Sequence, residues 1–519
     1  MLQLKNLLIS TFSAAVMLLF GGVNEVNGDP LTYEVIGDTV TIKDCKETAS
    51  GELVIPATYD GKPVTSIGSW AFWKCTSLTS VTIPDSITSI GNFTFHSCSD
   101  LTSVTIGNSV LNIMAGAFFR CSSLTSVTIP DSVVSIDRGA FIDCSALTSI
   151  EAGKGNAQYS SEGGVLFDKQ KTELVLFPTG KSGHYTIPDS VTSILDRAFN
   201  YCRNLFSVTI PDSVISIGGG AFESCISLAS VTIPDSVTRI GNFAFNDCRD
   251  LASVTISNSV TNIAEGTFYM CINLTSVTIP ASVSNIGNSA FSWCINLTGI
   301  NISDSVTSID SYAFLGCISL TSVTIPDSVT SIREGAFSRC RGLTSVTIPD
   351  SVTSIREKAF YDCRSLTNVT IPDSVIGIYN SAFEGCTSLK RITFRGEAPF
   401  FLGANVLSNV SGNARIFINS DAIAFGETFE GLPVIILEEL IISTFSKSAA
   451  PRRPFSKSAA PFSLNFESIS GLTYIIEASY DLKQWSEIGE AQAAGSSVEF
   501  TDWREALFRK QYYRFKLVE

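Results

Sequence analysis

Residues 228–250 read LASVTIPDSVTRIGNFAFNDCRD, and this stretch of 23 residues decides the fold. Within it, residues 231–233 (Val-Thr-Ile) alternate apolar and polar β-branched side chains, which predicts a half-buried strand. Pro234 lacks a backbone N–H group and therefore ends that strand. Phe245 and Cys248 are apolar residues three positions apart, a spacing typical of one helical turn. We therefore expect a strand, a tight turn, a second short extended segment and a helical turn.

The same pattern recurs along the chain, and its cysteine marks the period. Thirteen of the fourteen cysteines are in phase: the period of 23 residues runs from Cys75 to Cys144, and it resumes at Cys202 and runs to Cys386. The interruption after Cys144 equals one repeat plus an insertion of 35 residues. A phenylalanine stands three residues before each in-phase cysteine, and a leucine stands three residues after it. One repeat cannot bury its apolar face alone, so stacked repeats with strands about 4.8 Å apart are expected.

The pattern Leu-x-x-Val-x-Ile-Pro-x-Ser-Val-x-x-Ile-x-x-x-Ala-Phe-x-x-Cys resembles the BspA-like class of leucine-rich repeat over about residues 31–395. This resemblance implies a mainly β solenoid, with a parallel sheet on one side and short helical turns on the other. It also implies a secreted or cell-surface protein that acts in adhesion and protein binding. The resemblance brings no catalytic residues to this chain.

The domain boundaries are expected where the pattern starts, breaks and ends. Residues 7–20 are apolar and follow Lys5, which is typical of a secretory signal peptide and of a secreted or cell-surface protein without a membrane span. A heptad, FSKSAAP, occurs twice before the C-terminal region, which indicates a flexible linker. The resulting order is a signal peptide at 1–28, an N-terminal cap at 29–66, the repeat solenoid at 67–394 with a β-hairpin insertion at about 151–185, a C-terminal cap at 395–438, a Ser/Ala/Pro linker at 439–461 and a small all-β module at 462–519.

Composition and motifs argue against several function classes. The chain has 35 Lys and Arg against 49 Asp and Glu, so its net charge of −14 disfavours nucleic acid and anionic lipid as partners. It contains only two histidines and no nucleophile-elbow, phosphate-loop or dinucleotide fingerprint, so we expect no enzyme, no catalytic residues and no cofactor.

The cysteine column is interpreted as a row of buried thiols. A structural zinc or iron–sulfur site needs closely spaced cysteine pairs, whereas the in-phase cysteines are at least 23 residues apart, so no metal site is expected. Disulfides between adjacent repeats remain an alternative, because the spacing of stacked strands falls within the disulfide range. The state of Cys45, which is out of phase, stays open. A column of aspartates after the strands is interpreted as turn-forming, with Ca²⁺ binding as the alternative.

Two surfaces are candidates for binding. The first consists of aromatic residues in the variable positions just before the cysteines: Trp73, Phe119, Tyr201, Tyr269, Trp293 and Tyr361. Aromatic side chains are enriched in protein interfaces, so these residues predict recognition of an extracellular or cell-surface protein of a host or matrix. The alternative is that they are partly buried between repeats.

The second surface is the regular row of Ser and Thr on the first strand of each repeat, which includes Thr232, Thr255 and Thr278. Such a row predicts a structural or lattice-binding protein for polysaccharide or ice. The alternative is that small polar β-branched residues simply suit an exposed sheet. The sequence does not indicate the oligomeric state.

Overall fold

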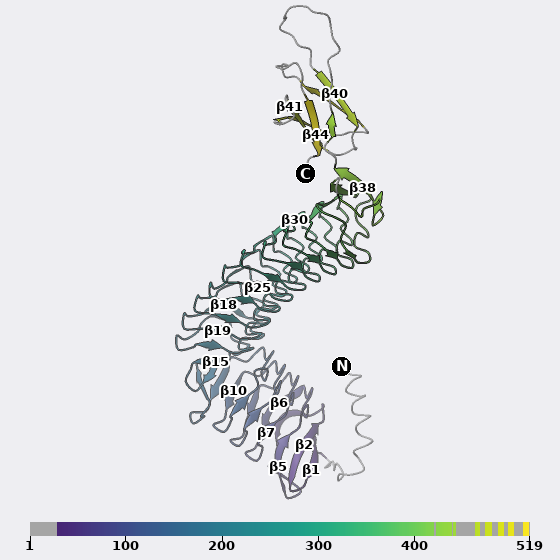
Figure 1. The fold of residues 1–519 in the computed structure, drawn as a ribbon. Coiled ribbons are helices and arrows are strands. Elements are labelled where there is room, and N and C mark those ends of the chain that lie inside the picture. Colours follow the sequence, from purple (N-terminus) through teal and green to yellow (C-terminus); the bar gives the residue numbers. More distant parts are fainter. Residues whose placement is uncertain are drawn as a thin grey trace, which may run out of the picture. The chain divides into compact units, whose positions relative to one another are not determined.

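The computed structural model describes residues 28–419 and 422–437, followed by strand segments at 440–442, 462–467, 473–479, 486–492, 497–502 and 512–517. The predicted signal peptide, apart from Gly28, and residues 443–461 of the predicted linker lie outside the described residues. The chain divides into unit 1, Met1–Arg391 with Pro399–Ala414, and unit 2, Ile392–Ala398 with Arg415–Glu519. Each unit is described by itself below, and Figure 1 labels their strands.

Unit 1 begins with a cap of paired strands: β1 (Leu31–Ile36), β2 (Thr39–Cys45), β3 (Ser50–Val54), β4 (Thr58–Tyr59) and β5 (Lys62–Ile67). β1 pairs antiparallel with β2, and β2 pairs parallel with β5. Tyr33 and Val40 from this hairpin are fully buried. The cap thus covers the apolar end of the first coil and continues into the parallel array.

Each repeat then forms one coil, and Figure 1 shows the coils stacked on one another. Each coil adds one strand to each of two columns. The first column contains β6 (Ser77–Thr82), β8 (Ser103–Thr105), β10 (Ser126–Ile129), β12 (Ser149–Ala152), β16 (Gly183–Thr186), β18 (Leu205–Thr209), β20 (Ser230–Thr232), β22 (Ser253–Thr255), β24 (Ser276–Thr278), β26 (Gly299–Asn301), β28 (Ser322–Thr324), β30 (Ser345–Thr347) and β32 (Asn368–Ile371). The second column contains β7 (Ser89–Ile90), β9 (Asn112–Ile113), β11 (Ser135–Ile136), β15 (Glu173–Leu176), β17 (Ser193–Ile194), β19 (Ser216–Ile217), β21 (Arg239–Ile240), β23 (Asn262–Ile263), β25 (Asn285–Ile286), β27 (Ser308–Ile309), β29 (Ser331–Ile332), β31 (Ser354–Ile355), β33 (Gly377–Ile378) and β35 (Phe401–Leu402).

Where neighbouring strands of a column are paired, they pair in parallel, with equivalent repeat positions opposite each other. In the first column Val231 pairs with Val254 and Thr232 pairs with Thr255. Val231 is buried while Thr232 is exposed, as the alternating pattern predicts. The mainly β solenoid expected from the sequence is therefore confirmed.

The third side of each coil is a run of turns that ends at the cysteine. In the coil of residues 228–250, Phe243 and Asp247 have left-handed φ angles of 57° and 58°. Their N–H groups each donate to a carbonyl oxygen of the following coil at 2.8 Å. Cys248 N, directly after Asp247, donates to the Phe245 carbonyl oxygen at 3.3 Å and closes a turn. Left-handed residues do not fit a right-handed helix, so the described residues contain turns and no helix where short helical turns were expected.

Phenylalanine rings form the centre of the core. Phe245 is fully buried, and its ring stacks on Phe222 at 5.1 Å and on Phe268 at 5.6 Å between ring centroids. Parallel rings at this spacing are offset-stacked, which is a favourable geometry for aromatic pairs. The repeat-to-repeat column of rings explains why a phenylalanine stands at this position in every coil.

All fourteen cysteines are buried and free of disulfides. From Cys98 onward, each in-phase thiol donates a hydrogen bond to the carbonyl oxygen of a phenylalanine in the preceding coil; the Sγ to O distance is 3.1 Å for Cys248 and Phe222. Cys45 Sγ and Cys75 Sγ both lie near the Lys46 carbonyl oxygen, at 3.7 and 3.6 Å. The cysteine side chains thus fill the core as small apolar groups and also donate hydrogen bonds within it.

The insertion replaces one coil with three strands: β13 (Tyr159–Glu162), β14 (Val165–Asp168) and β15. β13 and β14 pair antiparallel, as do β14 and β15, while β15 joins the second column by pairing in parallel with β17. β16 then joins the first column. Phe177 continues the column of rings, because it stacks on Phe199 at 4.8 Å.

Unit 2 contains β34 (Arg391–Phe394), which begins at the unit boundary, and the strands β36 (Arg415–Asn419), β37 (Thr428–Phe429), β38 (Leu432–Leu437), β39 (Leu440–Ile442), β40 (Phe462–Glu467), β41 (Thr473–Ser479), β42 (Ser486–Gln492), β43 (Ser497–Asp502) and β44 (Tyr512–Leu517). β36 and β38 pair in parallel. β41 pairs antiparallel with β42 and β44, and β40 pairs antiparallel with β43. β39, which lies within the predicted linker range, pairs antiparallel with β44. Among the described residues, no helix has the length and hydrophobicity that crossing a membrane requires.

Candidate functional site

The side of the coils formed by the turns carries a chain of aromatic contacts over the first three repeats. Trp70 stacks on Phe93 at 4.5 Å between ring centroids, and the His96 ring lies 5.3 Å from Trp70 and 4.9 Å from Phe119. The Trp70 side chain remains 39% exposed. Trp70 and Phe93 occupy the position five residues before the cysteine, where the left-handed backbone turns the side chain outward. These contacts produce a continuous aromatic surface rather than isolated rings.

A groove of about 610 Å³ lies beside this surface. Its charged and aromatic lining residues are Lys74, Arg120, Asp143, Tyr201 and Arg203, and the rest of its lining is mainly hydroxyl side chains. We call it the aromatic groove. It runs across the turn side from the first coil to the coil that follows the insertion, since Lys74 precedes Cys75 and Arg203 follows Cys202.

Three cation–π pairs surround the aromatic groove. Lys74 Nζ lies 4.4 Å from the centroid of the Trp73 ring. The guanidinium of Arg120 lies 5.3 Å from the Phe119 ring, and that of Arg203 lies 5.0 Å from the Tyr201 ring. Each pair holds a positive charge next to an aromatic face at the surface, an arrangement that contributes about 0.5–1 kcal/mol at exposed sites.

The groove carries local positive charge although the chain is acidic overall. Asp143 accepts hydrogen bonds or ion pairs from Arg120 Nε at 3.2 Å and Arg203 Nη2 at 3.5 Å. The two arginines and Lys74 exceed this single carboxylate, so the lining has excess positive charge. The ion pairs are solvent-exposed on the arginine side and therefore weak, which leaves the guanidiniums able to bind other carboxylates.

His96 is neutral at physiological pH. Burial lowers the pKa of this imidazole, and the positive charges of Arg120 and Lys74 lower it further. Its Nδ1 atom lies 2.9 Å from the Ser97 hydroxyl oxygen, which fixes the ring among its aromatic neighbours. An uncharged ring stacked on Phe119 keeps the surface apolar between the two cations.

The structure brings together only some of the residues predicted from the sequence. Tyr201 lines the aromatic groove, while Trp73 and Phe119 each lie next to a cation that lines it. Tyr269, Trp293 and Tyr361 lie in later coils, and Trp293 covers Gly316 of the next coil with one side of its ring. All six predicted aromatic side chains are half-buried, namely Trp73, Phe119, Tyr201, Tyr269, Trp293 and Tyr361.

Trp70 and Phe93 were not singled out by sequence reasoning. An isoleucine, which we call the inner isoleucine, stands eight residues before each in-phase cysteine. Trp70 and Phe93 occupy the third position after it, and the variability of this position was the available sequence signal. The pattern did not reveal that the backbone is left-handed there, so nothing in it indicated that the side chains turn outward and stack across coils.

The predicted Ser/Thr face is exposed but its pairing is not uniform. Thr232, Thr255 and Thr278 all point to solvent. Thr232 pairs with Thr255, whereas Thr278 belongs to a separate two-stranded ladder and pairs with Asn301. The aspartate column is engaged locally: Asp85 Oδ1 accepts a hydrogen bond from the Asn108 N–H of the following coil at 2.7 Å. The described part of the chain contains no group of three or more His, Cys, Asp or Glu side chains arranged to hold a metal.

The stacked coils, the two strand columns and the columns of leucine, phenylalanine and cysteine define a leucine-rich-repeat solenoid. The chain belongs to the BspA type leucine rich repeat family, whose model matches residues 52–163, 177–298 and 284–412. No curated protein matches the chain.

Several solved bacterial structures are similar to the chain. A leucine rich cell surface protein from Faecalibacterium prausnitzii is 30% identical, with 76% of this chain and 99% of that chain covered and a TM-score of 0.48. A leucine-rich repeat protein from Bacteroides ovatus is 26% identical, with 80% and 100% covered and a TM-score of 0.49. Another from Eubacterium ventriosum is 25% identical, with 63% and 97% covered and a TM-score of 0.46.

Proposed function

We propose that this chain is exported, is secreted or held at the cell surface, and binds another protein through the aromatic groove. The partner is an extracellular or cell-surface protein of a host or of the matrix, and the contact serves adhesion. We propose a binding role without catalysis. The predicted signal peptide supports export, and the repeat family supports an extended binding surface.

The observation that carries the proposal is the set of three cation–π pairs around one groove. Aromatic and arginine side chains are the residue types that most often dominate binding energy in protein interfaces. Here Trp73, Phe119 and Tyr201 each combine a half-buried ring with an adjacent cation. A ring that is already packed on one side loses little conformational freedom when a partner covers the other side.

The charge of the groove indicates the partner's chemistry. The local excess of Lys74, Arg120 and Arg203 over Asp143 stands out in a chain with a net charge of −14. An acidic segment with an apolar anchor residue complements such a surface, because opposite potentials raise the association rate and fix the register. Binding is therefore expected to weaken as salt concentration rises.

The test captures proteins from extracellular-matrix and cell-surface extracts with the full chain, identifies them, and measures the purified partner by surface plasmon resonance. A triple variant, Trp73→Ala, Phe119→Ala and Tyr201→Ala, is expected to lose at least about tenfold in affinity. The matched control is Tyr361→Ala, which removes an equally half-buried aromatic residue far along the repeat. Equal binding by the triple variant and the wild type contradicts the proposal.

A second candidate is binding of a regular polymer or ice by the Ser/Thr face, supported by the exposed and register-paired Thr232 and Thr255. Substituting Thr232, Thr255 and Thr278 by Val keeps the β-branched shape and removes the hydroxyl groups. Loss of binding in this variant, with the groove variant unaffected, favours the lattice role.

We also propose that residues 462–519 form a small all-β module. The antiparallel pairing of β41 with β42 and β44 supports this proposal.

A further inference from the structure

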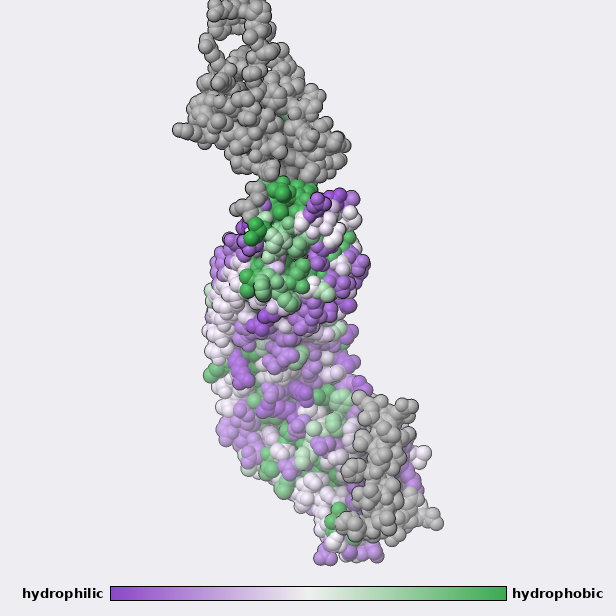
Figure 2. All heavy atoms as spheres, turned by 45° about the vertical axis from the view of Figure 1, so that its right-hand side comes forward, coloured by the Kyte–Doolittle hydropathy of each residue, from purple (hydrophilic) through white to green (hydrophobic). Residues whose placement is uncertain are grey.

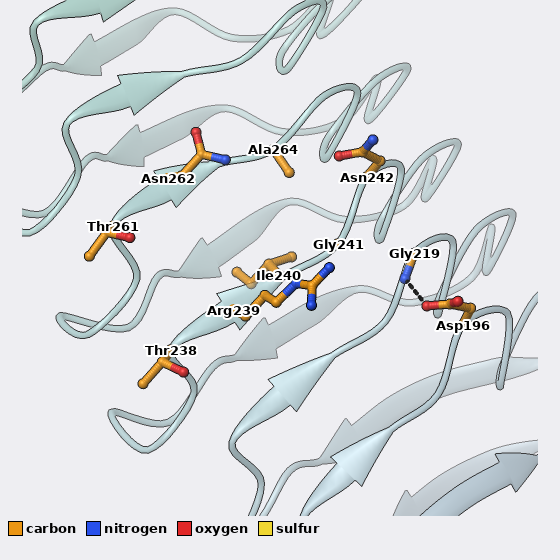
Figure 3. A pocket seen from close by; sticks show the side chains of 10 residues that line it. All are labelled: Asp196, Gly219, Thr238, Arg239, Ile240, Gly241, Asn242, Thr261, Asn262 and Ala264. Carbon is orange, nitrogen blue, oxygen red and sulfur yellow. Dashed lines mark hydrogen bonds between the residues drawn. The ribbon is translucent and has the colours of Figure 1, made fainter.

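A second hollow lies on the second strand column, in the coils that follow the insertion. One part of it has a volume of about 420 Å³ and is lined by Asp196, Gly219, Arg239 and Asn242 among others. Figure 3 shows these residues. A neighbouring space of about 700 Å³ shares Asp196, Gly219 and Asn242 with the first. Both volumes lie in the range of small-molecule sites, about 300–1,000 Å³. We call the combined hollow the glycine trough.

Three consecutive glycines create this hollow. Gly218, Gly219 and Gly220 follow the inner isoleucine of their coil, at positions where the preceding coil carries Leu-Asp-Arg and the following coil carries Gly-Asn-Phe. The middle coil therefore has no side chains at these three positions, while the side chains of the two adjacent coils form the walls of the hollow. The hollow is thus specified by one local departure from the repeat.

One wall of the trough is an aromatic ring. Phe243 lies flat against Gly266 of the next coil, so closely that a Cβ at Gly266 would come within 2.3 Å of the ring. The Phe243 side chain is nevertheless 37% exposed. On its other side is Gly220, where a Cβ would meet Glu223 and Arg197 but no aromatic ring. The ring therefore has one covered face, and Phe243 is among the residues that line the larger space of the trough.

The other walls of the trough carry carboxylate, guanidinium and amide groups, each of which can form two hydrogen bonds at once. Arg138 Nη1 binds Asp196 Oδ2 at 2.6 Å across the insertion, and Asp196 Oδ1 accepts a hydrogen bond from Gly219 N at 2.7 Å. Both contacts fix the Asp196 carboxylate at the edge of the trough. Figure 3 shows the Arg239 side chain extending along its strand and Asn242 projecting from the turn that follows the same strand. Among the described residues, Arg197 and Arg239 form no ion pair.

The charge balance of the lining selects the ligand class. Three carboxylates, Asp137, Asp196 and Glu223, face three guanidiniums, Arg138, Arg197 and Arg239. These charges cancel, so the lining favours neither an anion nor a cation. Planar carboxylate, amide and guanidinium groups beside an exposed aromatic face instead match a sugar, whose adjacent hydroxyls take paired hydrogen bonds and whose C–H face stacks on a ring.

We infer that the glycine trough binds a neutral oligosaccharide, with one sugar ring stacked on Phe243. The trough is open along the coils, so it accommodates a segment of a longer chain rather than an enclosed small molecule. This site is separate from the aromatic groove and from the Ser/Thr face, and it does not depend on the proposed protein partner.

The experiment titrates the full chain by isothermal calorimetry with neutral hexasaccharides of glucose, mannose and galactose, and with hexauronates of the same length. Gly219→Leu fills the trough without backbone strain, because a Cβ at Gly219 meets only ordinary contacts at 3.4 and 3.8 Å and its φ is not left-handed. The matched control is Ser311→Leu, which adds the same side chain at the equivalent repeat position outside the trough. Phe243→Ala removes the stacking ring, and Tyr312→Ala is its control, since Tyr312 lies over Gly335 in the same way.

We expect at least one neutral hexasaccharide to bind, with affinity reduced about tenfold or more by Gly219→Leu and by Phe243→Ala and unchanged by the two controls. Circular dichroism confirms folding of each variant. Three results overturn the inference: no neutral hexasaccharide binds, only the hexauronates bind, or Gly219→Leu binds as well as the wild type. Each of these results leaves the protein-binding proposal untouched, because the groove residues are intact in every variant.

Discussion

The thiol of Cys248 donates a hydrogen bond to the carbonyl oxygen of Phe222, one coil earlier, with 3.1 Å between sulfur and oxygen. Cys271 makes the same contact with Phe245, and Cys294 makes it with Phe268. Each of these buried carbonyl groups also accepts a hydrogen bond from the backbone N–H three residues further on, so the thiol supplies a second hydrogen bond that an apolar side chain would not make. This accounts for cysteine, rather than alanine or valine, at the position.

Replacing the thiol tests this role. Cys248→Ala is expected to lower the free energy of unfolding by about 1–2 kcal/mol, because it removes the second hydrogen bond to the Phe222 carbonyl and opens a small void. Cys248→Ser is expected to lose less, since its hydroxyl still donates. Urea denaturation followed by circular dichroism compares the two, and equal losses would show that packing alone matters.

The thiols are expected to be unreactive in the folded protein. Burial raises the pKa of Cys144 and of Cys340 to about 12, so almost no thiolate is present at neutral pH. Native protein at pH 8 should resist iodoacetamide, whereas protein unfolded without reductant should be alkylated at most of the thirteen in-phase cysteines. Mass spectrometry identifies which cysteines are alkylated. Systematic disulfides between adjacent coils would contradict the buried-thiol interpretation.

Removing one ring from the phenylalanine column is expected to destabilise the core strongly. Phe245→Ala removes a fully buried side chain that stacks on rings above and below it, and it is expected to cost about 3–5 kcal/mol. Phe243→Ala in the same coil is the control, because that ring is partly exposed and should cost much less. A loss below about 1 kcal/mol for Phe245→Ala would mean that the column contributes little to stability.

His96 introduces a pH dependence at acid pH. Burial and the nearby cations hold its pKa below the value of about 6.5 that applies to the unfolded chain. As pH falls, the unfolded chain takes up this proton first, so stability present above pH 6.5 is lost as pH falls through the native pKa.

The measurement is the midpoint of thermal unfolding between pH 7.5 and pH 5. His96→Gln is expected to show a smaller decrease than the wild type over this range. His184→Gln is the control, because it removes the only other histidine, which is exposed on β16. An identical decrease in the wild type and His96→Gln would assign the acid sensitivity to other groups.

Much of the architecture follows from the sequence because the repeat is strict. The alternation at residues 231–233 and the in-phase cysteines predict the strand, its exposed Thr232 and the stacking of coils, all of which the structure contains. The turn side was mispredicted as helical. The spacing of Phe245 and Cys248 fits a helix, and the left-handed conformation of Phe243 and Asp247 has no signature in these bulky residues.

The candidate sites were only partly predictable, because they depend on which coils lie next to each other across the insertion. Arg138 and Asp196 are 58 residues apart in sequence but form an ion pair of 2.6 Å. The groove likewise joins Arg120 to Arg203 through Asp143. Aligning the repeats identifies the variable positions. Only the path of the chain through the insertion shows which of these positions lie next to each other in space.

The way the insertion rejoins the array has a mechanical consequence. Phe177 stacks on Phe199, but together with Phe141 it lines a small pocket of about 10 Å³. The Cys202 thiol lies 3.8 Å from the Phe177 carbonyl oxygen, whereas the Cys248 thiol lies 3.1 Å from that of Phe222. In a linear array each coil couples only to its neighbours, so a weak contact divides cooperative behaviour. Under mechanical load or heat, the solenoid is expected to separate at this junction into two parts that unfold independently. Both the glycine trough and the aromatic groove have residues on each side of the junction.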